Sequence, residues 1–215
     1  MRLKFLPSFV KRRGRITKRQ EESLTFLNKY SVFNIKDIQK ESLEYDHCCL
    51  EIGFGNAEHL IYQSDTNPKT LFIGSEVYMS GIGSLLSYIN KHEVTNIRIF
   101  SDDIRILLDQ DQIEIFDSVN IICPDPWPKE RHHKRRLING KFINMIQGFI
   151  KNNGYLFIST DWENYAESIK EVLDRSVFFI SSNNASLEKN SLTKFEQRGV
   201  DEGRDIHEFN YRKNN

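Results

Sequence analysis

Short apolar runs and apolar positions at helical spacing alternate along the chain of 215 residues. Runs of roughly four to eight residues that are rich in Val, Ile, Leu and Phe predict buried strands. Such runs lie at 48–55, 70–76, 96–100, 118–123, 155–159, 177–181 and 208–212. Between them, apolar residues recur every three or four positions, which predicts helices. These segments lie at 20–30, 57–63, 79–92, 136–151 and 162–175, and residues 102–103 open a further short helix.

The alternation of strand and helix predicts an α/β fold, with a mainly parallel sheet and helices on both of its faces. No repeat or low-complexity segment divides the chain, so we expect a single domain over residues 31–215. A basic arm with a short helix precedes it, over residues 1–30. Residues 31–45 are polar and irregular and are expected to be a connection. Asp161 is expected to cap the helix that follows it.

Charge is balanced overall but unevenly distributed. The 30 Lys and Arg residues equal the 30 Asp and Glu residues, so the net charge indicates no class of partner. Residues 1–19, in contrast, contain basic residues and no acidic one, and a second cationic segment lies at 129–136. Local cationic segments on a neutral protein are typical of proteins that bind phosphates at one place. We interpret the N-terminal segment as an arm that faces nucleic acid, with an organellar transit peptide as a second interpretation.

The three cysteines, Cys48, Cys49 and Cys123, lie in apolar runs and lack the spacing of metal ligands. They indicate buried, reduced thiols and hence a cytoplasmic protein. The histidines include one adjacent pair, and sequence neighbours rarely bind one metal ion together, so we expect no metal site. No apolar run approaches the roughly 20 residues that cross a membrane, so no membrane partner is expected.

A proline-rich loop follows the predicted strand 118–123. Pro124, Pro126 and Pro128 stop the strand and stiffen the loop that holds Asp125 and Trp127. The carboxyl ends of strands are where open α/β sheets bind ligands. A cluster of basic residues and histidines follows directly, namely Lys129, Arg131, His132, His133, Lys134, Arg135 and Arg136. Its position suggests chemistry beside a bound polyanion. The alternative interpretation is an ordinary loop followed by a run of solvated charges. The indole of Trp127 argues against it, because a large aromatic side chain held between prolines in a polar loop is unfavourable unless it packs on something.

Acidic residues stand at the ends of four predicted strands, namely Glu51, Glu76, Asp103 and Asp125. Gly53 and Gly55 follow the first of these acids and would let a ligand approach the backbone closely. Glu58 stands where a dinucleotide fingerprint has its third glycine, and acids near the loop repel phosphate, which disfavours NAD. Each acid alone could be a helix cap or a surface charge. Together they predict a cup for a cationic nucleoside without phosphate, and S-adenosylmethionine fits that description.

Blocks of sequence that cover nearly the whole chain resemble a known family. They lie at 14–17 with Gln20, 51–55, 124–127 with Lys129, 131–136, 160–163 with 165–166, and 193–196 with 198–199. The most specific are Pro-Asp-Pro-Trp at 124–127, His-Lys-Arg-Arg at 133–136 and Thr-Lys-Phe-Glu at 193–196. In this set and this order, the chain resembles the bacterial tRNA (guanine-N7-)-methyltransferases.

The resemblance implies a Rossmann-like class I methyltransferase fold, with a mostly parallel seven-stranded sheet whose last strand is antiparallel. It implies methyl transfer from S-adenosyl-L-methionine to N7 of the variable-loop guanosine of tRNA (position 46), which gives 7-methylguanosine. The implied cofactor residues are Glu51, Gly53, Gly55, Glu76, Asp103 and Asp125, and Asp125 is also the implied catalytic residue. The implied RNA contacts are Lys129, Arg131, His132, His133, Lys134, Arg135, Arg136, Asp161, Thr193, Lys194, Phe195 and Glu196.

Other functions fit the same pattern less well. One is methylation of an exocyclic amine of another RNA, and a second is a noncatalytic RNA-binding subunit on this fold. The proline loop differs from that of amine enzymes, because a single proline separates Asp125 from Trp127. For the adenine of the cofactor, both Asp102 and Asp103 are candidates, and we prefer Asp103. The expected partner is tRNA, and the expected assembly is a monomer or a homodimer.

Overall fold

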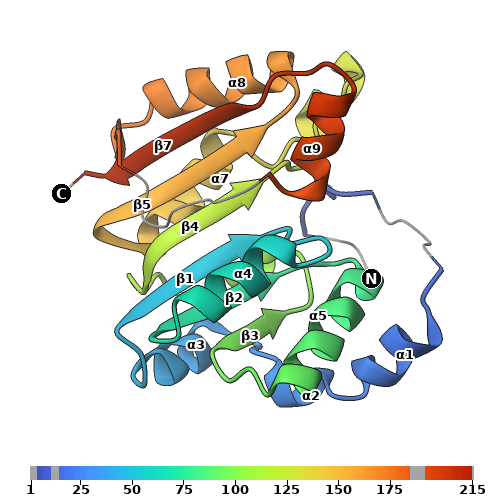
Figure 1. Ribbon diagram of the computed structural model, residues 1–215. Coiled ribbons are helices and arrows are strands. Elements are labelled where there is room, and N and C mark those ends of the chain that lie inside the picture. The colour runs from blue at the N-terminus through green and yellow to red at the C-terminus, as the bar shows by residue number, and fades with distance from the viewer. Residues whose placement is uncertain (1–3, 11–14, 185–191, 215) are drawn as a thin grey trace.

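A single β-sheet is the framework of the molecule. The structure is a computed structural model, and it describes residues 4–10, 15–184 and 192–214. Within the described residues, seven strands form one sheet in the order β3-β2-β1-β4-β5-β7-β6 (Figure 1). The strands are β1 His47–Ile52, β2 Thr70–Ser75, β3 Ile97–Phe100, β4 Phe116–Ile122, β5 Ile150–Thr160, β6 Phe179–Ser181 and β7 His207–Lys213. β1 pairs in parallel with β2 and β4, β2 with β3, and β4 with β5. β7 runs antiparallel to β5 and β6, so the predicted sheet is confirmed.

Helices cover both faces of this sheet. They are α1 Lys18–Leu24, α2 Leu27–Tyr30, α3 Ile35–Ser42, α4 Glu58–Thr66, α5 Met79–His92, α6 Ile104–Leu107, α7 Gly140–Ile146, α8 Glu163–Asp174 and α9 Lys194–Asp201. Neighbouring residues of β1 enter different cores because strand side chains alternate between faces. Leu50 joins a core with side chains of α3, α6, α7 and α8. Cys49 joins a second core with α2, α4 and α5.

The segment expected to be an irregular connection, 31–45, contains helix α3, so that prediction is wrong. Asn34 caps the helix: its side chain accepts from the backbone N–H of Asp37, and the Asp37 side chain accepts from the N–H of Asn34. This reciprocal capping box offsets the polar composition of the helix. Ile35 and Ile38, both buried, anchor it in the core.

Two other helix starts differ from expectation. The helix expected over 136–151 begins at Gly140, because Asn139 caps it by accepting from Phe142 N, and a 3-10 helix, η1 Glu130–Arg135, precedes it. Asp161 does not cap α8: the N-cap position is Trp162, which makes no side-chain cap bond. Because the carboxylate of Asp161 binds Arg204 instead, it is not available to the helix.

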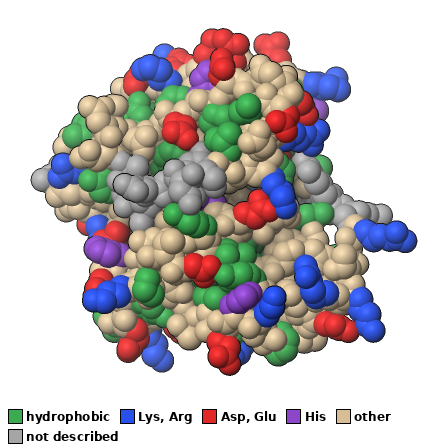
Figure 2. Space-filling model, viewed as in Figure 1, with side chains coloured by type: hydrophobic (Ala, Val, Ile, Leu, Met, Phe, Trp, Pro, Cys, Tyr) green, Lys and Arg blue, Asp and Glu red, His purple; other side chains and the backbone are tan. Residues whose placement is uncertain are grey.

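The parallel strands β1 to β5 bring their carboxyl ends to one edge of the sheet, which is the expected position of a binding site. On the face shown in Figure 2, cationic and anionic side chains are interspersed, as the balanced composition suggests. Among the described residues, no helix is long and apolar enough to cross a membrane.

Candidate active site

A cavity of about 350 Å³ lies at the carboxyl edge of the sheet, a size that suits a small-molecule ligand. Loops that follow β1, β2, β3, β4 and β5 all contribute to its wall. It brings together predicted site residues that are far apart in sequence: Gly53, Gly55, Glu76, Asp103, Asp125, Asp161 and Phe195. Glu51, Thr193 and Lys194 line a smaller neighbouring pocket. The two pockets share Gly53, Asn56, Ile122 and Phe195, so they form one region of the surface.

The loop between β1 and α4 turns through backbone conformations that favour glycine. Gly53 and Gly55 have positive φ angles of 75° and 54°. Ala57, at the N-cap of α4, has a φ of 65°, although it carries a side chain. The loop also lies against the start of α5, where a Cβ on Gly81 would come 2.0 Å from the carbonyl oxygen of Gly55. The backbone of this loop is therefore held at the cavity by close packing.

Glu76, directly after β2, points its carboxylate back to the glycine loop. Its Oε2 accepts from Gly55 N at 2.8 Å, and its Oε1 accepts from Val77 N at 2.7 Å and Tyr78 N at 2.9 Å. Burial raises the pKa of Glu76 above its ordinary 4.5, although the three N–H bonds act in the opposite direction. The carboxylate thus lies in the cavity wall in a fixed orientation.

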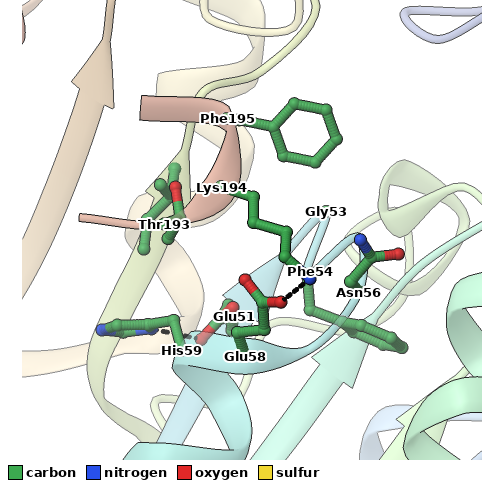
Figure 3. Close-up of a pocket in the computed structure, with 10 residues that line it drawn as sticks. Glu51, Gly53, Phe54, Asn56, Glu58, His59, Thr193, Lys194 and Phe195 are labelled. Atoms are coloured by element: carbon green, nitrogen blue, oxygen red, sulfur yellow. Dashed lines mark hydrogen bonds and ion pairs between the residues drawn. The ribbon is translucent and has the colours of Figure 1, made fainter. Parts of the chain in front are cut away.

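Glu51, near the end of β1, lies in the smaller pocket beside His59 of α4 (Figure 3). Nδ1 of His59 is 2.7 Å from Oε2 of Glu51, and both side chains are nearly buried, with 9% and 5% of their surface exposed. At the mouth of the same pocket, Lys194 forms an ion pair with Glu58 (Figure 3). Glu51 is therefore the deeper of the two carboxylates that line this pocket.

Asp103 and Asp102 both line the cavity, but they have different partners. The Asp103 carboxylate binds the guanidinium of Arg105 through two hydrogen bonds, of 2.9 Å and 2.6 Å. It also caps α6 by accepting from Arg105 N. Asp102 is exposed and accepts from the backbone N–H of Asp103 at 2.7 Å. In this conformation, Asp103 is the more firmly oriented of the two acids.

The proline loop after β4 carries Asp125 into the cavity. Cys123 and Trp127, on either side of it, both have a positive φ of 47°, so the loop is tightly bent. Asp125 Oδ2 accepts from the backbone N–H of Val10 at 3.0 Å. The Trp127 indole donates to the carbonyl oxygen of Ser8 at 2.9 Å. Residues 8–10 therefore lie along this loop.

Arg136 supports the proline loop from inside the protein. It is 5% exposed, and its Nε donates to the carbonyl oxygen of Pro126 at 2.9 Å. Its other guanidinium nitrogens bind Asn164, and the group lies over the Tyr165 ring at 4.7 Å. The sequence pattern grouped Arg136 with the RNA-facing cations, whereas in this conformation the side chain is occupied by protein contacts.

The remaining cations of this segment lie mostly at the surface. Lys129, Arg131 and Lys134 are exposed, and Arg135, which is half-buried, lies over the Trp127 ring at 5.0 Å. Partial burial and the neighbouring cations lower the pKa of His132. His132 and His133 are half-buried in the same turn. The turn therefore presents a cationic surface, which we define as Lys129, Arg131, Lys134 and Arg135, next to the cavity loop.

Residues 193–196 form the start of α9 rather than a free surface turn. Thr193 caps the helix, and the Glu196 carboxylate closes the box by accepting from Thr193 N at 2.9 Å. Glu196 is 0% exposed and also accepts from Ser159 Oγ at 2.7 Å. Phe195 is 46% exposed and lies against the glycine loop, where a Cβ on Gly55 would be 3.0 Å from its ring. The exposed members of the block, Lys194 and Phe195, lie where the two pockets meet.

Asp161 directly follows β5 and lines the cavity. Arg204 Nε donates to its Oδ2 at 2.8 Å, and Arg204 also pairs with Glu202. A Cβ on Gly199 would come 2.7 Å from the Asp161 side chain, so glycine permits α9 to pack this closely. Both Asp161 and Arg204 line the cavity.

Sequence patterns did not identify several residues that the fold brings to the site. Ser8 and Val10 reach it from the N-terminal segment, whose basic composition indicated RNA rather than the cavity. His59 lies within a helix and Arg204 in a polar segment near the C-terminus, and neither belongs to a motif. No local signal distinguishes them, because their partners are distant in sequence. Among the described residues, no group of three or more His, Cys, Asp or Glu side chains could hold a metal ion.

Comparison with known proteins identifies related sequences along most of the chain. Residues 46–209 match a family model whose description is "Putative methyltransferase". A tRNA (guanine-N(7)-)-methyltransferase of Nitrosococcus oceani is 37% identical, over 97% of this chain and 91% of that protein. One from Nitrosomonas europaea is 43% identical, over 74% of this chain and 73% of that protein.

Solved structures share the fold at low sequence identity. A 16S rRNA (adenine(1408)-N(1))-methyltransferase from Catenulisporales acidiphilia, solved with its cosubstrate SAM, aligns with a TM-score of 0.61 and 13% identity. The alignment covers 86% of this chain and 93% of that one. The 16S rRNA methyltransferase KamB aligns with a TM-score of 0.58 and 13% identity, over 86% of this chain and 96% of that one. These similarities show the Rossmann-like fold of methyltransferases.

Proposed function

The chain belongs to the tRNA (guanine-N(7)-)-methyltransferase family, and we propose that it methylates N7 of the variable-loop guanosine of tRNA, at position 46. The methyl donor is S-adenosyl-L-methionine (SAM), and the product is 7-methylguanosine. One observation carries the proposal: in a chain of this family, Glu76, Asp125 and the glycine loop meet at one cavity. An enzyme of this kind needs its cofactor and its target base to meet at such a place.

The chemistry of the residues at the cavity fits SAM. This cofactor carries an ammonium group, a sulfonium and two ribose hydroxyls but no phosphate, so carboxylates suit it. We assign the ribose hydroxyls to Glu76, the adenine to Asp103, the ammonium group to Glu51 and the region of the sulfonium to Asp125. Gly53 and Gly55 offer backbone that a ligand can approach closely.

When bound, SAM supplies an electrophilic methyl group on its sulfonium. Guanine N7 has a lone pair and no proton, so no side chain has to remove a proton before attack. What the protein supplies is alignment of the reacting atoms, at about 3–3.5 Å. Positive charge moves from sulfur to the purine, and a fixed carboxylate stabilises that transition state. Asp125, held between prolines in a bent loop, is the residue we assign to this role.

The cationic surface beside the cavity is the proposed site for tRNA phosphates. Three of its four charged side chains are exposed and the fourth, Arg135, is half-buried, next to the loop that holds Asp125. Because phosphate contacts position a nucleic acid, they would place the target guanine over the cavity. His132, His133, Asp161, Lys194 and Phe195 complete the proposed RNA contacts, Thr193 and Glu196 act through the start of α9 that they cap, and Arg136 acts through the proline loop that it supports.

We also infer the domain organisation, the compartment and the assembly of the protein. Residues 1–30 form an arm and residues 31–215 the methyltransferase domain. The buried thiols of Cys48 and Cys49 suit a reducing cytoplasm. The protein acts as a monomer or a homodimer.

The test is incubation with isotope-labelled SAM and unmodified tRNA, followed by analysis of the nucleosides. We expect label in 7-methylguanosine, and none when guanosine 46 is replaced by adenosine. Label in an N2- or N6-methylated nucleoside would show an enzyme that acts on an exocyclic amine. Binding of tRNA without any labelled product would show a noncatalytic RNA-binding protein.

A further inference from the structure

A row of four hydrogen-bonded side chains ends at Glu51 in the smaller pocket. Asn67 Nδ2 lies 3.3 Å from Gln63 Oε1, Gln63 Nε2 lies 3.3 Å from His59 Nε2, and His59 Nδ1 lies 2.7 Å from Glu51 Oε2. His59 and Gln63 are one helical turn apart on α4, so they lie on the same face of the helix. Gln63 is 1% exposed, so the row is shielded from water for most of its length.

The orientations of the Asn67 and Gln63 side-chain amides follow from the backbone carbonyl of Gln63. The Nδ2 group of Asn67 also donates to the carbonyl oxygen of Gln63, at 3.0 Å, and a carbonyl oxygen can only accept. The Asn67 amide is therefore oriented with its NH2 group toward Gln63, whose Oε1 accepts from it. The NH2 group of Gln63 consequently faces His59 and donates to Nε2 of the imidazole.

This orientation sets which ring nitrogen of His59 is placed to donate. An Nε2 atom that accepts a hydrogen bond carries no proton, so a ring that accepts from Gln63 has its single N–H on Nδ1. That proton is donated to Glu51 Oε2. In this arrangement the ring orients the Glu51 carboxylate through a hydrogen bond and adds no positive charge beside it.

The other charged groups at this pocket do not neutralise Glu51. Glu58 of α4 and Lys194 of α9 line the pocket and pair with each other at its mouth (Figure 3). Within the described residues, Oε1 of Glu51 has no hydrogen-bond partner. The pocket therefore contains an oriented carboxylate with one oxygen unused, next to the glycine loop.

We propose that His59 is a positioning residue, held neutral by Gln63, that orients Glu51 and leaves its charge for the ammonium group of SAM. The inference rests on the proposed function, because the methionine part of SAM supplies that ammonium group. If the ring were protonated, Glu51 would form an ion pair with His59 and would attract a cationic ligand less. The neutral ring orients the carboxylate without cancelling its charge.

Three variants separate orientation from charge. Gln63→Glu places a carboxylate beside Nε2 of His59, which favours the imidazolium and lets it form an ion pair with Glu51. His59→Leu removes the ring nitrogens, whereas His59→Asn keeps an N–H donor close to the position of Nδ1. Gln39→Glu, on the exposed side of α3, is the control that adds the same charge away from the pocket.

Calorimetric titration with SAM, and with 5′-methylthioadenosine, which lacks the amino acid part, measures the effect. We expect roughly tenfold weaker SAM binding for Gln63→Glu and His59→Leu, near wild-type binding for His59→Asn and Gln39→Glu, and unchanged binding of 5′-methylthioadenosine throughout. The nitrogen NMR signals of His59 should show a neutral ring with its proton on Nδ1 in the wild type, and an imidazolium in Gln63→Glu.

The possible outcomes keep this inference apart from the proposed function. Wild-type protein that binds neither ligand would contradict the proposed function itself. Wild-type binding together with unchanged SAM affinity in Gln63→Glu and His59→Leu would overturn only the role of His59. An imidazolium at neutral pH in the wild type, or an equal loss of affinity for 5′-methylthioadenosine, would overturn it as well.

Discussion

Val10 and Asp125 are joined by a hydrogen bond although 115 positions separate them: the Val10 backbone N–H lies 3.0 Å from Asp125 Oδ2. The donor is a neutral amide, and within the described residues no Lys or Arg forms an ion pair with Asp125. At the cavity wall, Val10 therefore helps to fix the orientation of Asp125 without adding a positive charge beside it. A carboxylate with two oxygens can accept this bond and still face a ligand.

Asp125→Ala should lose most methyltransferase activity, about 100-fold or more in kcat, because a fixed carboxylate beside the transferring methyl group is removed. Binding of tRNA should survive, since the cationic surface is untouched. Single-turnover methylation and tRNA titration measure the two effects, with Asp111→Ala, at an exposed position, as the control. Activity equal to that of the wild type would remove Asp125 from the mechanism.

The double variant Arg131→Ala with Lys134→Ala should weaken tRNA binding and make it less dependent on salt. Both side chains are exposed, and each phosphate contact contributes about one to the slope of log affinity against log salt concentration. We therefore expect the slope to fall by up to about two. Filter binding over a salt series measures it, and an unchanged slope would mean that these cations are only solvated surface charges.

Arg136→Ala should act on stability instead. Arg136 is buried, donates to Pro126 and Asn164, and lies over the Tyr165 ring, so its loss removes hydrogen bonds from a charged donor and the packing of the guanidinium. We expect a loss of roughly 2–4 kcal/mol in the free energy of unfolding, measured by urea titration, and a salt slope like that of the wild type. A stable variant with a reduced salt slope would instead place Arg136 on the RNA.

The raised pKa of Glu76 predicts that the stability of the protein depends on pH. Burial raises its pKa above 4.5, so the folded protein holds this proton more tightly than the unfolded chain does. The contribution of Glu76 to stability is therefore complete below the unfolded pKa and is lost as the pH rises through the folded one. In urea titrations from about pH 4.5 upward, the stability of Glu76→Gln should increase relative to wild type. Glu44→Gln, at an exposed position, should show no such trend, and a constant difference for Glu76→Gln would contradict the prediction.

The cysteines should differ in reactivity with iodoacetamide. Burial raises the pKa of Cys49 to about 12 and that of Cys48 well above its usual value, so little thiolate forms in the folded protein. Cys123 is half-buried and lines the cavity. Mass spectrometry should find Cys123 alkylated first, and bound SAM should slow that reaction. Alkylation of Cys48 or Cys49 before Cys123 would count against this arrangement.

Local pattern was enough to predict most of the sheet and several helices. Helix α5 spans the predicted residues 79–92, and each predicted strand exists with its ends shifted by up to five residues. The largest shift is at β5, which begins at Ile150, so the end of the helix predicted over 136–151 is wrong. Periodicity and turn residues act over a few positions, so they can be recognised in the sequence. Helix α3 was missed even though Asn34 and Asp37 form its capping box, because its polar composition concealed that local signal.

The sequence by itself determined which acids end the strands, where the glycine and proline loops lie, and which family the motifs resemble. Only the tertiary structure decided how those side chains are used: Asp161 binds Arg204 instead of capping α8, Arg136 turns inward to Pro126, and Glu51 meets His59. The physical reason is that strand ends and turns follow from neighbouring residues. The partner of a buried charge, in contrast, is whichever group packing brings within hydrogen-bonding distance, often from a remote part of the chain.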